Sequence, residues 1–354
     1  MTTLDTRHSP SPAARQRGLS LVELMISMAI GLLLLAGITS LIVNQSASRD
    51  ELEKSSRQIE NGRYAMQLLK DDIELAGYYG DFSPASGVAV TVPANPCGIT
   101  LTDWNANLPT VPVGIYGYAP AAANPTPCTG QVTNYQPNTA VLVIERAATL
   151  AVPAVPPPTT GAIYLQASRC PLDTPQTFVI GTSGFTMQKK DCAAGIAGTP
   201  ADLRQFYVNL YYISSCDICS PTPDNIPTLK LVQNGAAPIP LVEGIENMRF
   251  DYGIDTDGDG YPNTYTTTPT SWPDVVAVRV NLLARNNDST MNYQDTKTYC
   301  LSGNTANCVV PGALPGVMPS PATALVGPVN DQYKRHLYSN LIRAINPSQR
   351  RAMQ

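Results

Sequence analysis

One long uncharged run near the N-terminus constrains this chain more than any other feature. From Leu19 to Val43 the sequence reads LSLVELMISMAIGLLLLAGITSLIV, with no proline and one charged residue, Glu23. A helix needs about 20 apolar residues to cross the hydrocarbon core of a bilayer, and residues 24–43 are enough. The run is longer than the apolar core of a secretory signal, and no small-residue cleavage site follows it. The run therefore predicts a membrane-embedded helix.

The residues before this run predict its orientation. Arg7, Arg15 and Arg17 precede it, and basic residues favour the cytoplasmic side of a membrane helix. The N-terminus is therefore expected in the cytoplasm and the rest of the chain outside it. A plain single-pass anchor is the simplest interpretation of such a segment.

Glu23 argues against a plain anchor. A carboxylate near the centre of a membrane helix costs on the order of 2.5–3.5 kcal/mol, and such an acid usually has a partner. The sequence RG followed by LSLVE, around Gly18 and Leu19, resembles the type IV prepilin cleavage motif. The resemblance implies that prepilin peptidase cuts after Gly18 and that Leu19 becomes the methylated N-terminal residue. It also implies that Glu23 helps to neutralise the amine of a neighbouring subunit. The family usually has Phe where this chain has Leu19.

The helix is predicted to continue beyond the apolar run, to about Ala76. Apolar residues recur there on one helical face, among charged ones, and two glycines follow as a stop. The residues of this face are Leu52, Ile59, Met66, Leu69, Ile73 and Ala76, and the glycines are Gly77 and Gly80. A helix of this length spans roughly 85 Å. Its second half is expected to pack against a head domain; the alternative is an anchor followed by an unrelated coiled coil.

The rest of the chain predicts a β-rich head. Short apolar runs separated by Pro, Gly, Asn and Thr indicate strands at 139–147, 161–167, 203–213, 227–233 and 274–285. The proline-rich stretches between Pro84 and Pro158 are interpreted as loops inserted on a compact sheet. The expected fold is α+β and pilin-like, with a long N-terminal helix packed on an antiparallel sheet with disulfide-bonded loops. The expected domains are a leader (1–18), a transmembrane half-helix (19–44), an amphipathic half-helix (45–80) and an extracytoplasmic head (81–354).

All eight cysteines lie in the predicted head, where an oxidising compartment favours disulfides. Sequential pairing is expected because each close pair brackets a turn-rich loop. The CxxC pair could also be a redox site or bind zinc, but it precedes Ser-Pro-Thr-Pro rather than the helix that lowers the thiol pKa in redox enzymes. The candidates are Cys97, Cys128, Cys170, Cys192, Cys216, Cys219, Cys300 and Cys308.

One segment of the head has the pattern of a calcium loop. Asp255, Asp257 and Asp259 alternate and are followed by Gly260, as in the first half of a D-x-D-x-D-G loop. The carbonyl of Tyr261 and the side chain of Asn263 would complete the ligands. The twelfth position is Thr266 instead of the usual Glu, so weak binding is expected. An ion-free Asp/Gly turn is the alternative.

Three stretches of the C-terminal half resemble the PilW family of minor pilins. They are LVEGIENMRFDYGIDTDGDG (241–260), WPDVVAVRVNLLAR (272–285) and RHLYSNLIRAIN (335–346), the last being a basic segment expected to close the sheet. Residues 81–204 resemble no family. The resemblance implies a subunit of a type IV pilus that takes part in a priming or tip complex. Its implied partners are other minor pilins, the major pilin, prepilin peptidase, the inner-membrane assembly platform and membrane lipid. The implied location is the inner membrane with a periplasmic head, and then the pilus.

Composition argues against catalysis and nucleic-acid binding. The only histidines are His8 and His336, which excludes His-based triads and multi-His metal sites. The sequence lacks G-x-G-x-x-G, G-x-x-x-x-G-K-[ST], G-x-S-x-G and H-E-x-x-H motifs. With 23 basic and 27 acidic residues there is no cationic surplus to bind phosphates. The expected function is structural, in pilus biogenesis and pilus-dependent motility or adhesion. The alternatives are a type II secretion pseudopilin and a membrane-anchored, calcium-dependent adhesin.

Overall fold

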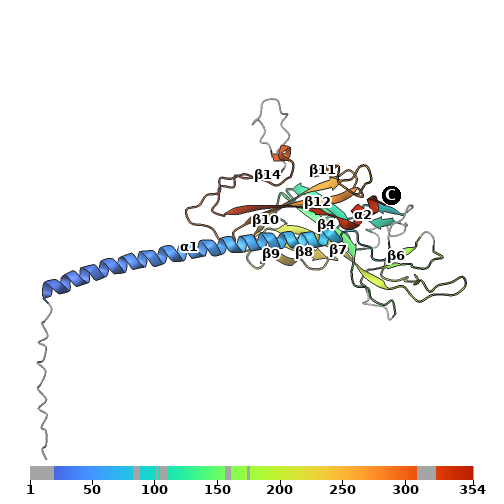
Figure 1. The fold of residues 1–354 in the computed structure, drawn as a ribbon, viewed down its shortest axis with the longest axis horizontal. Coiled ribbons are helices and arrows are strands. Elements are labelled where there is room, and N and C mark those ends of the chain that lie inside the picture. Colours follow the sequence, from blue (N-terminus) through green and yellow to red (C-terminus); the bar gives the residue numbers. More distant parts are fainter. Residues whose placement is uncertain are drawn as a thin grey trace, which may run out of the picture. The chain divides into compact units, whose positions relative to one another are not determined.

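The computed structural model describes residues 20–82, 88–100, 103, 110–155, 161–173, 176–308 and 324–353. The chain forms two compact units, one ending at Glu53 and one beginning at Lys54. The first helix, α1 (Leu21–Leu75), contributes to both (Figure 1). Its 55 residues bear out the single long helix expected from the sequence.

The second unit holds every described strand, so the fold is α+β as predicted. The described residues of this unit also form three short helices. Two are 3-10 helices, η1 (Thr126–Cys128) and η2 (Thr305–Cys308), and the third is the C-terminal α-helix α2 (Ile345–Arg351). The strands are β1 (Ala89–Thr91), β2 (Thr110–Pro112), β3 (Ile115–Ala121), β4 (Thr139–Ala147), β5 (Tyr164–Ala167), β6 (Phe178–Gly181), β7 (Leu203–Ser214), β8 (Thr228–Gln233), β9 (Ile239–Glu243), β10 (Ile245–Ile254), β11 (Thr264–Thr266), β12 (Val275–Arg285), β13 (Tyr299–Cys300), β14 (Leu325–Val326) and β15 (Arg335–Arg343).

Two sheets build the body of this unit. The larger has the strand order β3-β4-β7-β5-β6, with β8 added to β7 and β9 added to β8. The smaller has the order β11-β10-β12-β15. All pairings within these two sheets are antiparallel, as expected. The C-terminal strand β15 pairs with β12 along its whole length, so the basic C-terminal segment closes the smaller sheet.

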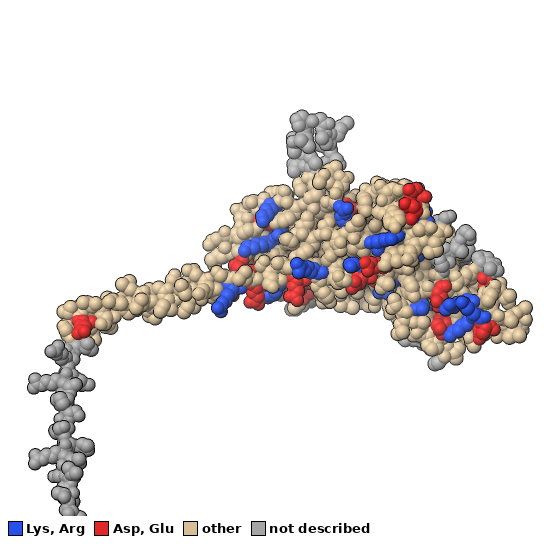
Figure 2. Space-filling view, in the orientation of Figure 1, with Lys and Arg blue, Asp and Glu red and all other residues tan. Residues whose placement is uncertain are grey.

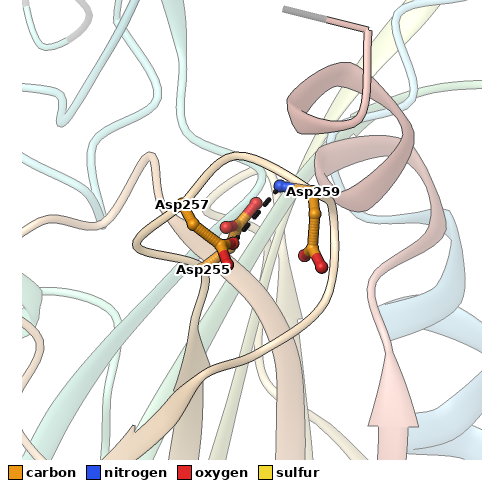
Figure 3. Close-up of side chains that lie close together, drawn as sticks. All are labelled: Asp255, Asp257 and Asp259. Carbon is orange, nitrogen blue, oxygen red and sulfur yellow. Dashed lines mark hydrogen bonds between the residues drawn. The ribbon is translucent and has the colours of Figure 1, made fainter.

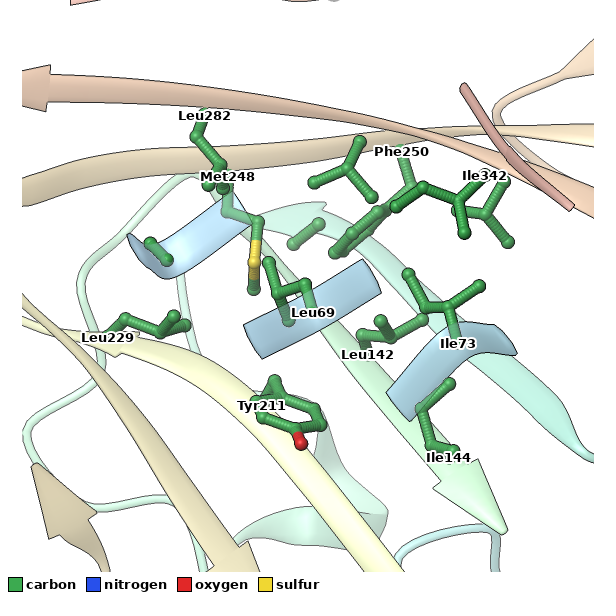
Figure 4. Packing of buried hydrophobic residues seen from close by; sticks show 14 of the residues in the cluster. Leu69, Ile73, Leu142, Ile144, Tyr211, Leu229, Met248, Phe250, Leu282 and Ile342 are labelled. Atoms are coloured by element: carbon green, nitrogen blue, oxygen red, sulfur yellow. The ribbon is translucent and has the colours of Figure 1, made fainter. Parts of the chain in front are cut away.

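The second part of α1 packs among residues of both sheets. Leu69 and Ile73 are completely buried in a cluster with Met248 of β10, Leu282 of β12 and Leu142 of β4 (Figure 4). Burying a Leu or Ile side chain stabilises a fold by about 1.5–3 kcal/mol relative to leaving it exposed. The helix is therefore part of the core of this unit.

The buried face of α1 is displaced from the predicted stripe. Leu69, Ile73 and Ala76 are buried as expected, but Ile59 and Leu52 are 41% and 71% exposed, so the prediction is wrong for these two. Gln58 continues the buried face instead. Its amide donates to the carbonyls of Ala284 and Lys334 at 2.8 and 2.9 Å, which satisfies backbone groups that an apolar side chain would leave without a partner.

Gly62 also lies on the buried face of the helix, where the ring of Tyr338 approaches the backbone. A Cβ at position 62 would lie 2.2 Å from a carbon of that ring. The absence of a side chain at Gly62 thus lets an aromatic side chain of β15 pack directly on the helix backbone.

Each of the five predicted strands overlaps a strand of the structure, but the sequence interpretation missed others, including β6, β9 and β10. The predicted segment 139–147 is β4, and 203–213 and 274–285 correspond to β7 and β12. The region between Pro84 and Pro158 is more than loop, because it also contains β1, β2 and β3. Short runs broken by Gly and Pro, such as Ile115–Ala121, hide their strand character from a search for alternation.

Four disulfides join the cysteines in sequence order, which is the pairing expected from the sequence. The bonds are Cys97–Cys128, Cys170–Cys192, Cys216–Cys219 and Cys300–Cys308. Cys216 and Cys219 therefore form a bond with each other at the end of β7.

A carboxyl group is buried where α1 ends. Glu145 of β4 is 1% exposed, and neither of its carboxyl oxygens has a hydrogen-bond partner among the described residues. Its backbone carbonyl accepts the N–H of Gly77, two residues after the last residue of α1. Burial raises the pKa of the Glu145 carboxyl well above its ordinary value of 4.5.

The buried carboxyl predicts a pH dependence of stability. Above pH 4.5 the unfolded chain releases the Glu145 proton and the folded chain keeps it, so stability falls as pH rises toward the folded-state pKa. We expect Glu145→Gln to melt at a higher temperature than the wild type at pH 8, with little difference near pH 4.5. The difference between the two proteins in the free energy of unfolding grows by at most about 1.4 kcal/mol per pH unit. Melting curves of the full chain in detergent measure it. Glu74→Gln is the control on a solvent-facing acid, and an equal effect of both variants would contradict the role of burial.

Candidate functional site

The first unit presents an apolar helix surface with no covering partner among the described residues. Large apolar side chains on every side of α1 between Leu21 and Val43 are more than half exposed. This segment is long and apolar enough to cross a membrane by length and composition. Figure 2 shows almost no charged side chains along it on the face drawn. A helix that is apolar all round requires lipid or other apolar helices around it.

Glu23 lies in the first turn of this helix. Its backbone carbonyl accepts a hydrogen bond from the Ser27 hydroxyl at 2.7 Å. No described residue forms an ion pair with its carboxylate. Gly18 and Leu19, the predicted cleavage and methylation positions, lie outside the described residues.

The three aspartates of the predicted calcium loop come together between β10 and β11. One carboxylate oxygen from each of Asp255, Asp257 and Asp259 lies within 4.8 Å of the others (Figure 3). Asp255 is completely buried, and Asp257 and Asp259 are both exposed. The two carboxylate oxygens of Asp255 accept the N–H groups of Gly258 and Gly260 at 2.7 and 2.9 Å. These bonds fix the loop in a turn.

The other two residues of the predicted ligand set, Asn263 and Tyr261, also make contacts in or beside the loop. The amide of Asn263 donates to Asp257 at 3.0 Å, and its oxygen accepts the N–H of Thr256 at 2.7 Å. The ring of Tyr261 lies 4.7 Å from the guanidinium of Arg343, and its N–H donates to Asp259. The ligand residues of a D-x-D-x-D-G loop are thus present, and hydrogen bonds among them hold the loop in a turn.

An arginine that the sequence interpretation missed completes this site. Arg351 of α2 lies with its Nε 3.4 Å from Asp255 Oδ2 and with a terminal nitrogen 3.0 Å from Asp274. Burial alone would raise the pKa of Asp255, but the two backbone N–H groups and Arg351 outweigh it and hold the pKa below the ordinary value. No local pattern links Arg351 to a loop 96 residues earlier in the chain. Its neutralising charge could not be predicted from the motif.

The twelfth loop position lies in a strand, and its hydroxyl accepts the N–H of Thr268. Thr266 belongs to β11 and pairs with Tyr252 of β10. The loop instead docks on α2, where the Ser348 hydroxyl donates to the carbonyl of Gly260 at 2.6 Å. The donor set fits a hard cation only in part, because three carboxylates are present and one of them already has a guanidinium beside it. Calcium binding therefore stays a prediction.

Comparison with known families adds two matches. The model of the family described as type IV pilus-assembly protein W matches residues 210–346, less than half of the chain. This segment includes β8 to β15 and the acidic loop. The prokaryotic N-terminal methylation motif matches residues 13–39, around Gly18, Leu19 and Glu23. No curated protein and no solved structure matches the chain.

Calcium is tested directly by its effect on stability. With no twelfth carboxylate, we expect a dissociation constant of about 10⁻⁴–10⁻³ M, as in weak extracellular calcium modules. At ten times that concentration the folded state gains about 1.4 kcal/mol, which is a melting shift of a few degrees. Thermal melting of the full chain in detergent with calcium measures it, and Asp257→Asn should abolish the shift. An unchanged melting temperature at 10 mM calcium, or an equal shift in the variant, would contradict the prediction.

Proposed function

We propose that this chain is a minor pilin of the PilW family and belongs to the complex that primes or tips a type IV pilus; the matches to the PilW family model and to the N-terminal methylation motif support this. The single observation that carries the proposal is the N-terminal helix. It combines the methylation motif, an acid in its first turn and an exposed apolar surface. This combination serves a subunit that leaves the lipid bilayer and packs its helix among similar helices.

Two environments can cover such a helix in turn. In the membrane, lipid tails surround the apolar side chains between Leu21 and Val43. In a fibre, the same side chains pack against helices of neighbouring subunits by van der Waals contact. Glu23 would then pair with the methylated N-terminal amine of a neighbour, which relieves the cost of a charge in an apolar surrounding. The implied partners are other minor pilins and the major pilin.

The direction of insertion and the processing follow from the same segment. Arg7, Arg15 and Arg17 support a cytoplasmic N-terminus and a periplasmic head. Cleavage after Gly18 by prepilin peptidase would remove these residues. The subunit would then wait in the inner membrane, beside the assembly platform, until it enters the fibre.

The size of the head and its disulfide-bonded loops support a position in the priming or tip complex rather than a repeated position along the pilus shaft. Four disulfides hold loops around two sheets in a head of more than 270 residues. A head of this size is difficult to repeat at every position of a tightly packed helical lattice. We therefore propose a structural, non-catalytic role that supports pilus biogenesis and, through the fibre, motility or adhesion.

A deletion strain tests this function. We expect loss of surface pili, counted by shearing and microscopy, and their return when the wild-type gene is supplied. Glu23→Ala should reach the membrane fraction at the normal level and fail to restore pili, because its partner amine is left without a counter-charge. Glu74→Ala, which removes an acid from the same helix outside the apolar segment, should restore them.

Two results would contradict the proposal. Unchanged pili in the deletion strain, with exported proteins retained in the periplasm, would indicate a type II secretion pseudopilin instead. Full restoration of pili by Glu23→Ala would contradict the pairing role of Glu23.

A further inference from the structure

A cavity of about 560 Å³ opens beside the central part of β10. Ligand-binding cavities have volumes of about 300–1,000 Å³. One wall is β3 and the turn before β4, and the opposite wall includes Leu301 and Val326. β10 lies between them, with Asn247, Arg249 and Phe250 lining the cavity.

The edge of β10 that faces this space has no strand beside it over most of its length. On one side β10 pairs with β12 from Ile245 to Ile254. On the other side β11 pairs only with residues 252–254, and no described strand pairs with residues 246–251. Thr267 and Thr268, which directly follow β11, also line the cavity. The cavity therefore lies where a longer β11 would run.

A cation at this edge lacks an acidic partner. Among the described residues, the buried Nε of Arg249 has no hydrogen-bond partner, and a terminal nitrogen makes one long hydrogen bond, 3.5 Å, to the carbonyl of Asn138. No described acid forms an ion pair with it. Glu246 also lines the cavity, but its carboxylate is held by Arg335 at 2.9 Å. Burial lowers the pKa of Arg249, which reflects the cost of this charge in its present surroundings.

A second polar group beside Arg249 is also incompletely bonded. Asn247 is 8% exposed, and its side-chain oxygen has no hydrogen-bond partner in the part of the chain that the structure describes. Its amide nitrogen donates to the same Asn138 carbonyl, at 3.4 Å. Buried polar groups normally have partners, so two incompletely bonded groups in one cavity wall indicate that a ligand supplies the missing contacts.

We propose that this cavity binds an extended peptide segment of another protein, which adds as a strand to the free edge of β10 and places an Asp or Glu side chain against Arg249. The backbone of the peptide would bond to residues 246–251, which at about 3.3 Å per residue give roughly 20 Å of edge. A carboxylate can accept two parallel N–H bonds from one guanidinium. Leu301, Leu325 and Val326 also line the cavity and offer apolar contacts to the peptide.

Strand addition accounts for more of the site than a small organic acid does. A small acid would neutralise Arg249 and leave the backbone groups of β10 on this edge without a strand. Free edges of this kind are usually covered or blunted, because they template pairing with other chains. The inference rests on the cavity and holds whether or not the fibre is a pilus.

The test is selection from a synthetic library of hexapeptides, randomised at every position, on the immobilised full chain in detergent. We expect the selected peptides to share one Asp or Glu at a fixed position. A selected peptide should bind Arg249→Gln at least 10-fold more weakly, the loss of about 1.4 kcal/mol. Lys190→Gln, which removes an exposed charge outside the cavity, should bind as the wild type does. N-methylation of alternate backbone nitrogens in the peptide should also weaken binding at least 10-fold.

Three results would overturn the proposal. The first is a selection that enriches no peptide, or enriches peptides that share no acidic residue. The second is that Arg249→Gln binds the selected peptide as tightly as the wild type does. The third is that the N-methylated peptide binds as tightly as the unmethylated one. If Arg249→Gln does not fold, Arg249→Lys takes its place, because it keeps the charge and loses the two-pronged geometry. We expect that variant to bind several-fold more weakly than the wild type, and wild-type affinity would overturn the proposal.

Discussion

The burial of one face of α1 among residues of two sheets is the interaction on which the second unit depends. Leu69 and Ile73 contact a cluster drawn from β4, β7, β8, β10 and β12, so the helix supplies side chains to a core that neither sheet completes alone. Polar contacts fix its position along the sheets. Gln58 bonds to two backbone carbonyls, and Asp72 accepts hydrogen bonds from Arg146, Asn209 and Tyr211. A helix held in this way serves as core of the head while its first half stays available to lipid or to other subunits.

The short C-terminal helix α2 joins two distant parts of this unit. Asn346 and Arg350 donate to the carbonyls of Ala76 and Gly77, where α1 ends and where helical carbonyls otherwise have no partner. Ser348 and Arg351 of the same helix bond to the acidic loop. The loop is therefore fixed to the same element that terminates α1. A cation bound there would stiffen a connection that the chain already makes with an arginine.

Much of the fold is predictable because it follows from local periodicity. The apolar run, the strands β4, β7 and β12, and the sequential disulfides all depend on neighbours in the sequence. The displaced stripe of α1 could not be predicted, because Gln58 and Gly62 are explained only by Ala284, Lys334 and Tyr338, more than 220 residues away. Asp72 gives a weak signal, since it is an acid among Leu69, Ile73 and Ala76 on one helical face. The free edge of β10 could not be predicted either, because the sequence of residues 245–254 does not indicate which strands pair with it.

The central claim is that the N-terminal helix is a processed pilin stem. The most direct measurement is the intact mass and the N-terminal fragment mass of the protein purified from cells that express prepilin peptidase. We expect a chain that begins at Leu19 with one added methyl group. A chain that retains residues 1–18 would contradict the account and favour a membrane anchor, with the head held permanently at the membrane.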